Sequence, residues 1–343
     1  MTMTWQARRL LTAIVATTPL MAACGGGSGS ESPSESAAVS GTLATYTPFE
    51  TANLTEQQAH VNAWERIRSI RGRADFAAAD FGDVAAPSPT GGTIADIYVN
   101  SGLRDKVLAS VQSHDYGAGA GTNAVGKAMD GLITKAIADG AEGKNARVQG
   151  QIIDKTLQRF FYESVMHKLN ARNAMTYDEA FGHSGFDFAG DTAKAKGIAY
   201  TAYHRDEHFP TDFHGTIFRE FLKGKVALDQ RFAGTNPGRV DKGELPDLEA
   251  AMAEIDRQWL LVFAYSSGYE FADLAVNPNP PPILAEAAMY FNIVEDFMKT
   301  RDAEAAAYIR AQIDATPYDR ATTIDTAGIA ARINQTFGID VTK

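Results

Sequence analysis

The sequence contains almost no cysteine, since Cys24 is the only one among 343 residues. A chain with one thiol forms no internal disulfide, and it cannot build a zinc or iron–sulfur centre from several thiolates. Any metal site must therefore use histidine, aspartate and glutamate.

The sequence also has fewer positive than negative charges. Its 32 Lys and Arg residues and 42 Asp and Glu residues give a formal net charge of -10. This acidic balance argues against nucleic acid as a partner and against docking of the folded domain on anionic lipid.

The apolar stretch near the N-terminus, residues 10–21, is too short for a membrane span and is interrupted by the Thr-Thr-Pro segment 17–19. Two arginines precede it, and small residues follow it, as in a secretory signal peptide. The end of this region, 20–24 (Leu-Met-Ala-Ala-Cys), resembles the signal of a bacterial lipoprotein, in which the cysteine carries the lipid and becomes the new N-terminus. The alternatives are an ordinary signal peptide that contains a cysteine, or a single membrane span. We expect residues 1–23 to be the signal peptide and Cys24 to be lipidated.

A lipid anchor implies where the protein resides. More than one acyl chain makes attachment stable, so the membrane is a partner through the anchor and is not spanned. In lipoproteins of this kind an aspartate after the cysteine favours retention in the inner membrane, whereas this chain has Gly25. We therefore expect an outer-membrane lipoprotein that is periplasmic or displayed at the cell surface. The region 24–45 begins with a Gly/Ser/Pro-rich segment, 25–36, which is typical of a flexible linker.

The region 46–343 has apolar residues at helical spacing far more often than in alternation. We find no convincing set of strands, so the expected fold is all-α, either one helical bundle or two packed bundles. Asn53 and Glu56 occupy capping-box positions, and Ser266-Ser267-Gly268 predicts a break or kink in a long helix. The spacing predicts helices at about 55–71, 94–113, 124–139, 149–169, 194–208, 212–232, 246–265 and 283–299, with short helices after Asp302 and from Thr326.

Histidine is scarce but unevenly placed, because five of the seven histidines fall between residues 167 and 214. Carboxylates accompany them, and imidazole with carboxylate is a good ligand set for zinc, iron, copper or nickel. Clustering in sequence is not clustering in space, and His167 or His214 can equally be structural. The sequence does not identify a cofactor; the candidate is a transition metal ion, iron or zinc. The candidate metal ligands are Asp178, Glu179, His183 and Asp187, with His204 and His208 as additions.

The segment His204-Arg205-Asp206-Glu207-His208 fits H-x-x-E-H, the signature of the inverzincin zinc peptidases. In those enzymes the two histidines bind zinc and the glutamate is the general base, and the resemblance places the third ligand at about Glu286. The helical spacing argues the other way, because it leaves His204 and His208 nearly opposite the apolar side of their helix. Those peptidases are also α/β proteins. The alternative to a zinc site is that this segment is simply an exposed, polar end of a helix.

Two short motifs carry a family resemblance. The segments 150–155 (Gly-Gln-Ile-Ile-Asp-Lys) and 177–182 (Tyr-Asp-Glu-Ala-Phe-Gly) resemble an uncharacterised group of imelysin-like bacterial lipoproteins. The resemblance implies a helical, exported and lipid-anchored protein, and imelysins proper are associated with iron-regulated uptake, while some were described as peptidases. Their G-x-H-x-x-E metal pattern is absent, since 182–187 has its glycine, histidine and carboxylate at another spacing. No ligand is therefore carried over, and the related group leads us to expect an aromatic residue where this chain has His183.

The DEAFG motif has two physical interpretations. Asp178 and Glu179 can project from a loop that Phe181 anchors in the core, which is how many functional loops are built. Alternatively, Asp178 caps a helix and Glu179 pairs with an arginine such as Arg172.

Three functions remain open at this point. The leading hypothesis is a non-enzymatic binding lipoprotein that serves metal or iron-complex acquisition. The first alternative is a zinc-dependent peptidase that uses His204, Glu207, His208 and Glu286. The second is an envelope structural or assembly lipoprotein that binds a protein partner and no small ligand.

Overall fold

The computed structural model describes residues 45–114, 123–232, 238–277 and 279–341. The predicted signal peptide, Cys24 and nearly all of the predicted linker lie outside the described residues. The described chain belongs to one compact unit, Leu43–Lys343, and consists of twelve α-helices and three short 3-10 helices without a strand. The prediction of an all-α fold is confirmed. None of the described helices is long and apolar enough to cross a membrane.

The first six helices form one group. Helix α5 packs against α4 and α6, while α1 packs against α6 and α2, and α3 packs against α4. These helices are α1 (Ala52–Arg71), α2 (Ile94–Asn100), α3 (Leu103–Ala109), α4 (Ala124–Ala141), α5 (Ala146–Asn170) and α6 (Ala174–Ser184).

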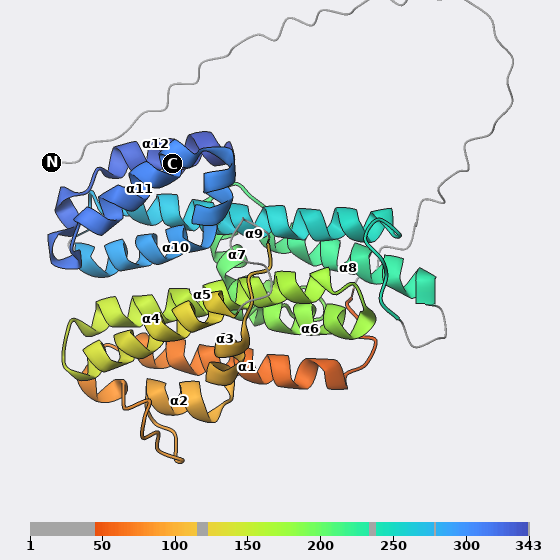
Figure 1. The fold of residues 1–343 in the computed structure, drawn as a ribbon, viewed down its shortest axis with the longest axis horizontal. Helices are drawn as coiled ribbons and strands as arrows, with labels where there is room; N and C mark the ends of the chain where they lie inside the picture. Colours follow the sequence, from red (N-terminus) through yellow and green to blue (C-terminus); the bar gives the residue numbers. More distant parts are fainter. Residues whose placement is uncertain (1–44, 115–122, 233–237, 278, 342–343) are drawn as a thin grey trace, which may run out of the picture. The chain divides into compact units, whose positions relative to one another are not determined.

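The last six helices form a second group around α9, which packs against α8, α10 and α12. Figure 1 shows the red to yellow helices α1–α4 in the lower part of the unit and the blue helices α10–α12 in the upper part, with α5 between them. The long contact between α5 and α10 joins the two groups. The second group comprises α7 (Gly197–His208), α8 (Phe213–Phe232), α9 (Pro246–Asp273), α10 (Pro280–Arg301), α11 (Ala303–Ala315) and α12 (Thr326–Phe337).

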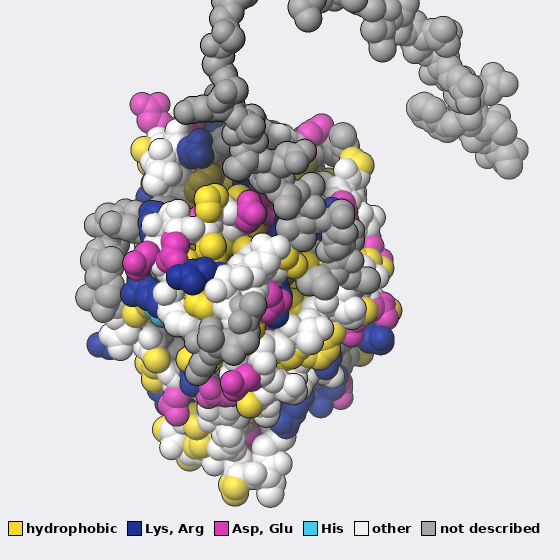
Figure 2. Space-filling view, turned by 90° about the vertical axis from the view of Figure 1, so that its right-hand side faces the viewer, with side chains coloured by type: hydrophobic (Ala, Val, Ile, Leu, Met, Phe, Trp, Pro, Cys, Tyr) yellow, Lys and Arg dark blue, Asp and Glu magenta, His cyan; other side chains and the backbone are white. Residues whose placement is uncertain are grey.

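The surface carries both signs of charge. On the face drawn in Figure 2, Lys and Arg side chains are interspersed with Asp and Glu among polar and apolar side chains. Many charged side chains of the described residues form ion pairs with close neighbours in the sequence, such as Lys194 with Asp191 and Arg257 with Glu254.

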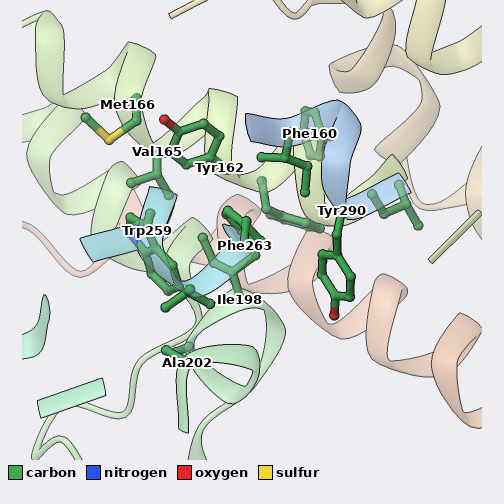
Figure 3. Packing of buried hydrophobic residues seen from close by; sticks show 14 of the residues in the cluster. Phe160, Tyr162, Val165, Met166, Ile198, Ala202, Trp259, Phe263 and Tyr290 are labelled. Carbon is green, nitrogen blue, oxygen red and sulfur yellow. The ribbon is translucent and has the colours of Figure 1, made fainter. Parts of the chain in front are cut away.

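One hydrophobic core runs through both groups of helices. Figure 3 shows side chains from α5, α7, α9 and α10 meeting in it, among them Phe160, Ile198, Trp259 and Tyr290. Trp259 is completely buried, and burying a large apolar side chain contributes about 1.5–3 kcal/mol. The two groups therefore share one hydrophobic core.

The predicted single helix 94–113 is two helices in the structure. Gly102 lies between α2 and α3 with φ +75 and ψ 0, in the left-handed region that stops a helix. The apolar residues keep a helical spacing across this turn, which is why the sequence pattern did not show the break.

The predicted break at residues 266–268 is wrong, because α9 continues through it to Asp273. Ser266 Oγ donates to the carbonyl of Val262 at 2.8 Å, and Ser267 Oγ donates to the carbonyl of Ala287 on α10 at 3.1 Å. A Cβ on Gly268 would lie 2.8 Å from a methyl carbon of Val341. These small residues allow close packing against neighbours, and the helix continues through them.

Candidate functional site

The DEAFG motif lies on α6 and not in a loop, which corrects the first interpretation of the motif. Asp178 is completely buried and receives three hydrogen bonds from the chain at the start of α1. Tyr46 Oη donates to Oδ1 at 2.8 Å, while the backbone N–H of Glu50 and the side-chain amide of Asn53 donate to Oδ2 at 3.0 and 3.1 Å. Burial raises the pKa of Asp178, and these hydrogen bonds offset part of the rise. Asp178 thus fastens the start of the described chain to α6.

The same contacts correct the predicted capping box of α1. The side chain of Asn53 is used by Asp178, and the carboxylate of Glu56 pairs with Lys106. The N-cap residue of α1 is Thr51, whose side chain makes no capping hydrogen bond. The side chains of Asn53 and Glu56 therefore make tertiary contacts and do not cap the helix.

The remaining carboxylates predicted near the motif also have protein partners. Glu179 pairs with Lys168, and Arg172, its predicted partner, pairs with Glu249 at 2.6 Å. Asp187 accepts a hydrogen bond from the N–H of Ala189 at 2.9 Å, within its own loop. These side chains do not converge with Asp178 on one point.

The H-x-x-E-H segment lies at the exposed end of α7. His204 Nδ1 is 3.2 Å from Glu207 Oε2, and their side chains are 39% and 45% exposed. His208 Nδ1 donates to the carbonyl of His204 at 2.8 Å. Glu286, the predicted third ligand, instead contacts two residues of α5, with Lys155 Nζ at 2.9 Å and Gln151 Nε2 at 2.6 Å.

Across the described residues, no group of three or more His, Cys, Asp or Glu side chains is arranged to hold a metal ion. Neither predicted set therefore forms a complete ligand shell, whether the set of Asp178, Glu179, His183, Asp187, His204 and His208 or the peptidase set with Glu207 and Glu286.

The GQIIDK motif builds a buried network of charges on α5. Asp154 is completely buried and accepts a hydrogen bond from Trp64 Nε1 at 2.8 Å. Arg71 Nη2 lies 3.1 Å and Lys155 Nζ 3.0 Å from its carboxylate. Burial by itself raises the pKa of Asp154, but the cations of Arg71, Lys155 and Arg68 hold it well below its usual range. The network ties α5 to α1 and, through Lys155 and Glu286, to α10.

A second buried carboxyl group, that of Glu270, lies on α9. Glu270 on α9 is buried, and its nearest cation is Arg205 on α7, with Nη1 at 3.8 Å. Burial, together with the negative charge of Glu286, raises the pKa of Glu270 to about 8. The Arg205 cation opposes this rise but does not cancel it, so burial favours the protonated carboxyl.

A different kind of polar site lies between α1, α3, α5 and α6, and we call it the histidine pocket. It is a cavity of about 210 Å³. Its polar lining comprises three histidines, two glutamates, two lysines, two serines and a glutamine: His60, His167, His183, Glu56, Glu163, Lys106, Lys168, Ser110, Ser164 and Gln57.

Two histidines of this pocket approach each other closely. His60 Nδ1 is 3.4 Å from His183 Nε2, and both side chains are about 2% exposed. That separation is longer than a usual N–H hydrogen bond of about 2.7–3.2 Å. The other ring nitrogen of His183, Nδ1, is 2.7 Å from Ser164 Oγ, and the edges of Phe160 and Phe161 pack around the same ring. The orientation of His183 is thus set by its surroundings.

Burial favours the neutral form of the histidines in the pocket. Burial lowers the pKa of His183 well below its usual value, and the neighbouring Lys168 lowers it further. Burial also lowers the pKa of His60 and of His167. Neutral imidazole is the form that binds metal ions.

The geometry of the pair fits part of a metal site. Two bonds of about 2.0–2.1 Å at a tetrahedral angle place their nitrogen atoms roughly 3.4 Å apart. His60 Nδ1 and His183 Nε2 have this separation. A partner on the second ring nitrogen, as Ser164 is for His183, is also typical of metal-binding histidines. The pair thus fits two ligands of a transition metal ion, with the rest of the coordination left to other groups or water.

Sequence reasoning found His183 but not its partner, because His60 lies 123 residues away. One signal was available. Glu56 and His60 on α1, and Glu163 and His167 on α5, both have the spacing E-x-x-x-H, which places the two side chains one helical turn apart on the same face. Both pairs line the pocket.

Comparisons of this chain with protein-family models, with curated proteins and with solved structures find no match. The resemblance to imelysin-like lipoproteins therefore stands on the GQIIDK and DEAFG motifs alone.

Proposed function

We propose that this protein is a lipid-anchored binding protein of the bacterial outer membrane, and that it takes up a transition metal ion in the histidine pocket. Its role would be metal acquisition and not catalysis. The observation that carries the proposal is the 3.4 Å separation of His60 Nδ1 and His183 Nε2 on the wall of a cavity. The lipoprotein-like signal ending at Cys24 supports the anchor.

The chemistry of the pocket favours an ion that prefers nitrogen ligands. Imidazole suits zinc, copper, nickel and iron, whereas magnesium and calcium prefer oxygen ligands. The buried, neutral state of His60 and His183 means that such an ion displaces few protons when it binds. The cavity of about 210 Å³ leaves room for water or a small co-ligand beside the ion.

The metal is tested on the full chain, extracted from bacterial membranes with detergent. After dialysis against Zn²⁺ and then against metal-free buffer, we expect about one zinc per chain by elemental analysis. His60→Ala and His183→Ala should each abolish retention, while His204→Ala, at the exposed end of α7, should leave it unchanged. A chain that retains no metal, or that loses it only with His204→Ala, would overturn the proposal.

The anchor is tested separately, by growth with radiolabelled palmitate. We expect the label on the chain and its loss in Cys24→Ser, which should also release the protein from the membrane fraction. An unlabelled chain would show that the signal resembles a lipoprotein signal only in sequence.

A further inference from the structure

Glu56 occupies a particular place on the wall of the histidine pocket. It precedes His60 by one turn of α1, so the two side chains lie on the same face of the helix, where residues four apart are neighbours. Its carboxylate Oε1 is 2.8 Å from Lys106 Nζ on α3, and the two side chains are 54% and 45% exposed. Exposed ion pairs of this kind contribute little to stability, so this pair breaks at low cost.

The second carboxylate of the pocket is held in a different way. Glu163 Oε2 accepts hydrogen bonds from the N–H and the Oγ of Ser113, at 3.0 and 2.7 Å, and Arg159 approaches Oε1 at 3.9 Å. Its side chain is nearly buried. Moving Glu163 would leave Ser113 without these bonds, whereas moving Glu56 only exposes Lys106 further to water.

We propose that Glu56 is the third protein ligand of the metal in the histidine pocket, and that Lys106 holds it aside until metal arrives. Binding would exchange the Lys106–Glu56 ion pair for a bond between the metal and the carboxylate. Two histidines and one glutamate are a known zinc ligand set that leaves one position open. The inference rests on the proposed function. It explains why, among the described residues, no third carboxylate or imidazole already lies in position beside His60 and His183 to complete a metal site.

The test is a double-mutant cycle on the full chain in detergent, with Co²⁺ and Zn²⁺ alone as the probes. Glu56→Gln should weaken Zn²⁺ binding by about tenfold or more and change the visible spectrum of the Co²⁺ form, because one ligand is lost. Lys106→Met should tighten binding several-fold, because Glu56 is freed. In the double variant the gain should vanish, and the affinity should equal that of Glu56→Gln.

Lys168→Met is the matched control. Lys168 lines the same pocket but pairs with Glu179, so its loss removes the same charge without freeing Glu56. We expect it to change the affinity for Zn²⁺ much less than Lys106→Met does. Equal tightening by both lysine variants, or tightening by Lys106→Met that persists in the Glu56→Gln background, would overturn the inference, because Lys106 would then act through its charge alone.

The failure of this inference is distinguishable from the failure of the proposed function. Metal binding that depends on His60 and His183 but is unchanged by Glu56→Gln would overturn the inference alone. A chain that binds no metal at all would overturn both.

Discussion

The network around Asp154 and the histidine pocket are both buried and polar, but their polar groups are satisfied in different ways. Asp154 contacts Trp64, Arg71 and Lys155 within hydrogen-bonding range, so its charge is balanced inside the protein. The two imidazoles of His60 and His183 are favoured in their neutral form and line a cavity. The distance between His60 Nδ1 and His183 Nε2 is longer than that of a good hydrogen bond. Burial of polar groups therefore does not by itself mark a binding site. Ligand-ready atoms beside open space are the better sign.

The largest effect should come from breaking the Asp154 network. Asp154→Ala leaves the buried Lys155 and the half-buried Arg71 without their central anion, and removing one partner of a buried ion pair typically costs about 3–5 kcal/mol. We expect a loss of this size in the free energy of unfolding, measured by urea denaturation. Asp191→Ala, which removes an exposed ion pair with Lys194, is the control and should cost less than about 1 kcal/mol. Similar losses in the two variants would contradict a structural role for the network.

A smaller loss is expected at Asp178, where the carboxylate is satisfied by three donors from the start of α1. Asp178→Asn reverses one donor–acceptor pair and weakens the others, which should cost about 1–3 kcal/mol. Hydrogen exchange of the amides in residues 46–53 should accelerate more than that of α9. Uniform acceleration along the chain would mean that Asp178 stabilises the whole fold and does not fasten its N-terminal end.

The pH dependence of stability separates the two regions further. Because the folded-state pKa of Glu270, about 8, lies above its ordinary value of 4.5, the folded chain holds a proton that the unfolded chain releases. The stability from this group is complete below about pH 4.5 and is lost as pH rises through 8. Glu270→Gln should therefore lose less stability than the parent chain over this range, as measured by thermal unfolding at a series of pH values. Parallel curves for the two proteins would contradict the raised pKa.

The opposite sign applies to His183. Its folded-state pKa is lowered, so its contribution to stability is present above its ordinary value of about 6.5 and is lost as pH falls below it. His183→Phe should flatten the loss of stability between about pH 6.5 and 5. An unchanged slope in the variant would show that His183 is not held neutral by burial.

The smallest effect is expected on the exposed end of α7. His204→Ala with Glu207→Ala removes an exposed contact, and we expect the free energy of unfolding to change by no more than about 0.5 kcal/mol. A large loss of stability would mean that the H-x-x-E-H segment contributes more to the fold than its exposure indicates.

The fold was predictable because helical spacing is local. The 3.6-residue period located α1, α4, α5 and α10 to within a few residues, and it also indicated an all-α core. The errors came from residues whose role depends on neighbours in space. Gly102 ends a helix within a continuous apolar pattern, and Gly268 is small because Val341 packs on it.

The candidate site was predictable only in part. The sequence drew attention to His183 but grouped it with carboxylates that are close in sequence. In the structure Asp178 and Glu179 point to other partners, and the neighbour of His183 comes from α1. No local pattern reports which faces of α1 and α6 meet, because that contact depends on the packing of the whole helical group.

Anomalous diffraction at the zinc absorption edge, from crystals of the protein soaked in Zn²⁺, tests the central claim most directly. The account predicts a single strong peak about 2.0–2.1 Å from both His60 Nδ1 and His183 Nε2. A peak at His204 and His208 instead, or no peak in the histidine pocket, would contradict it.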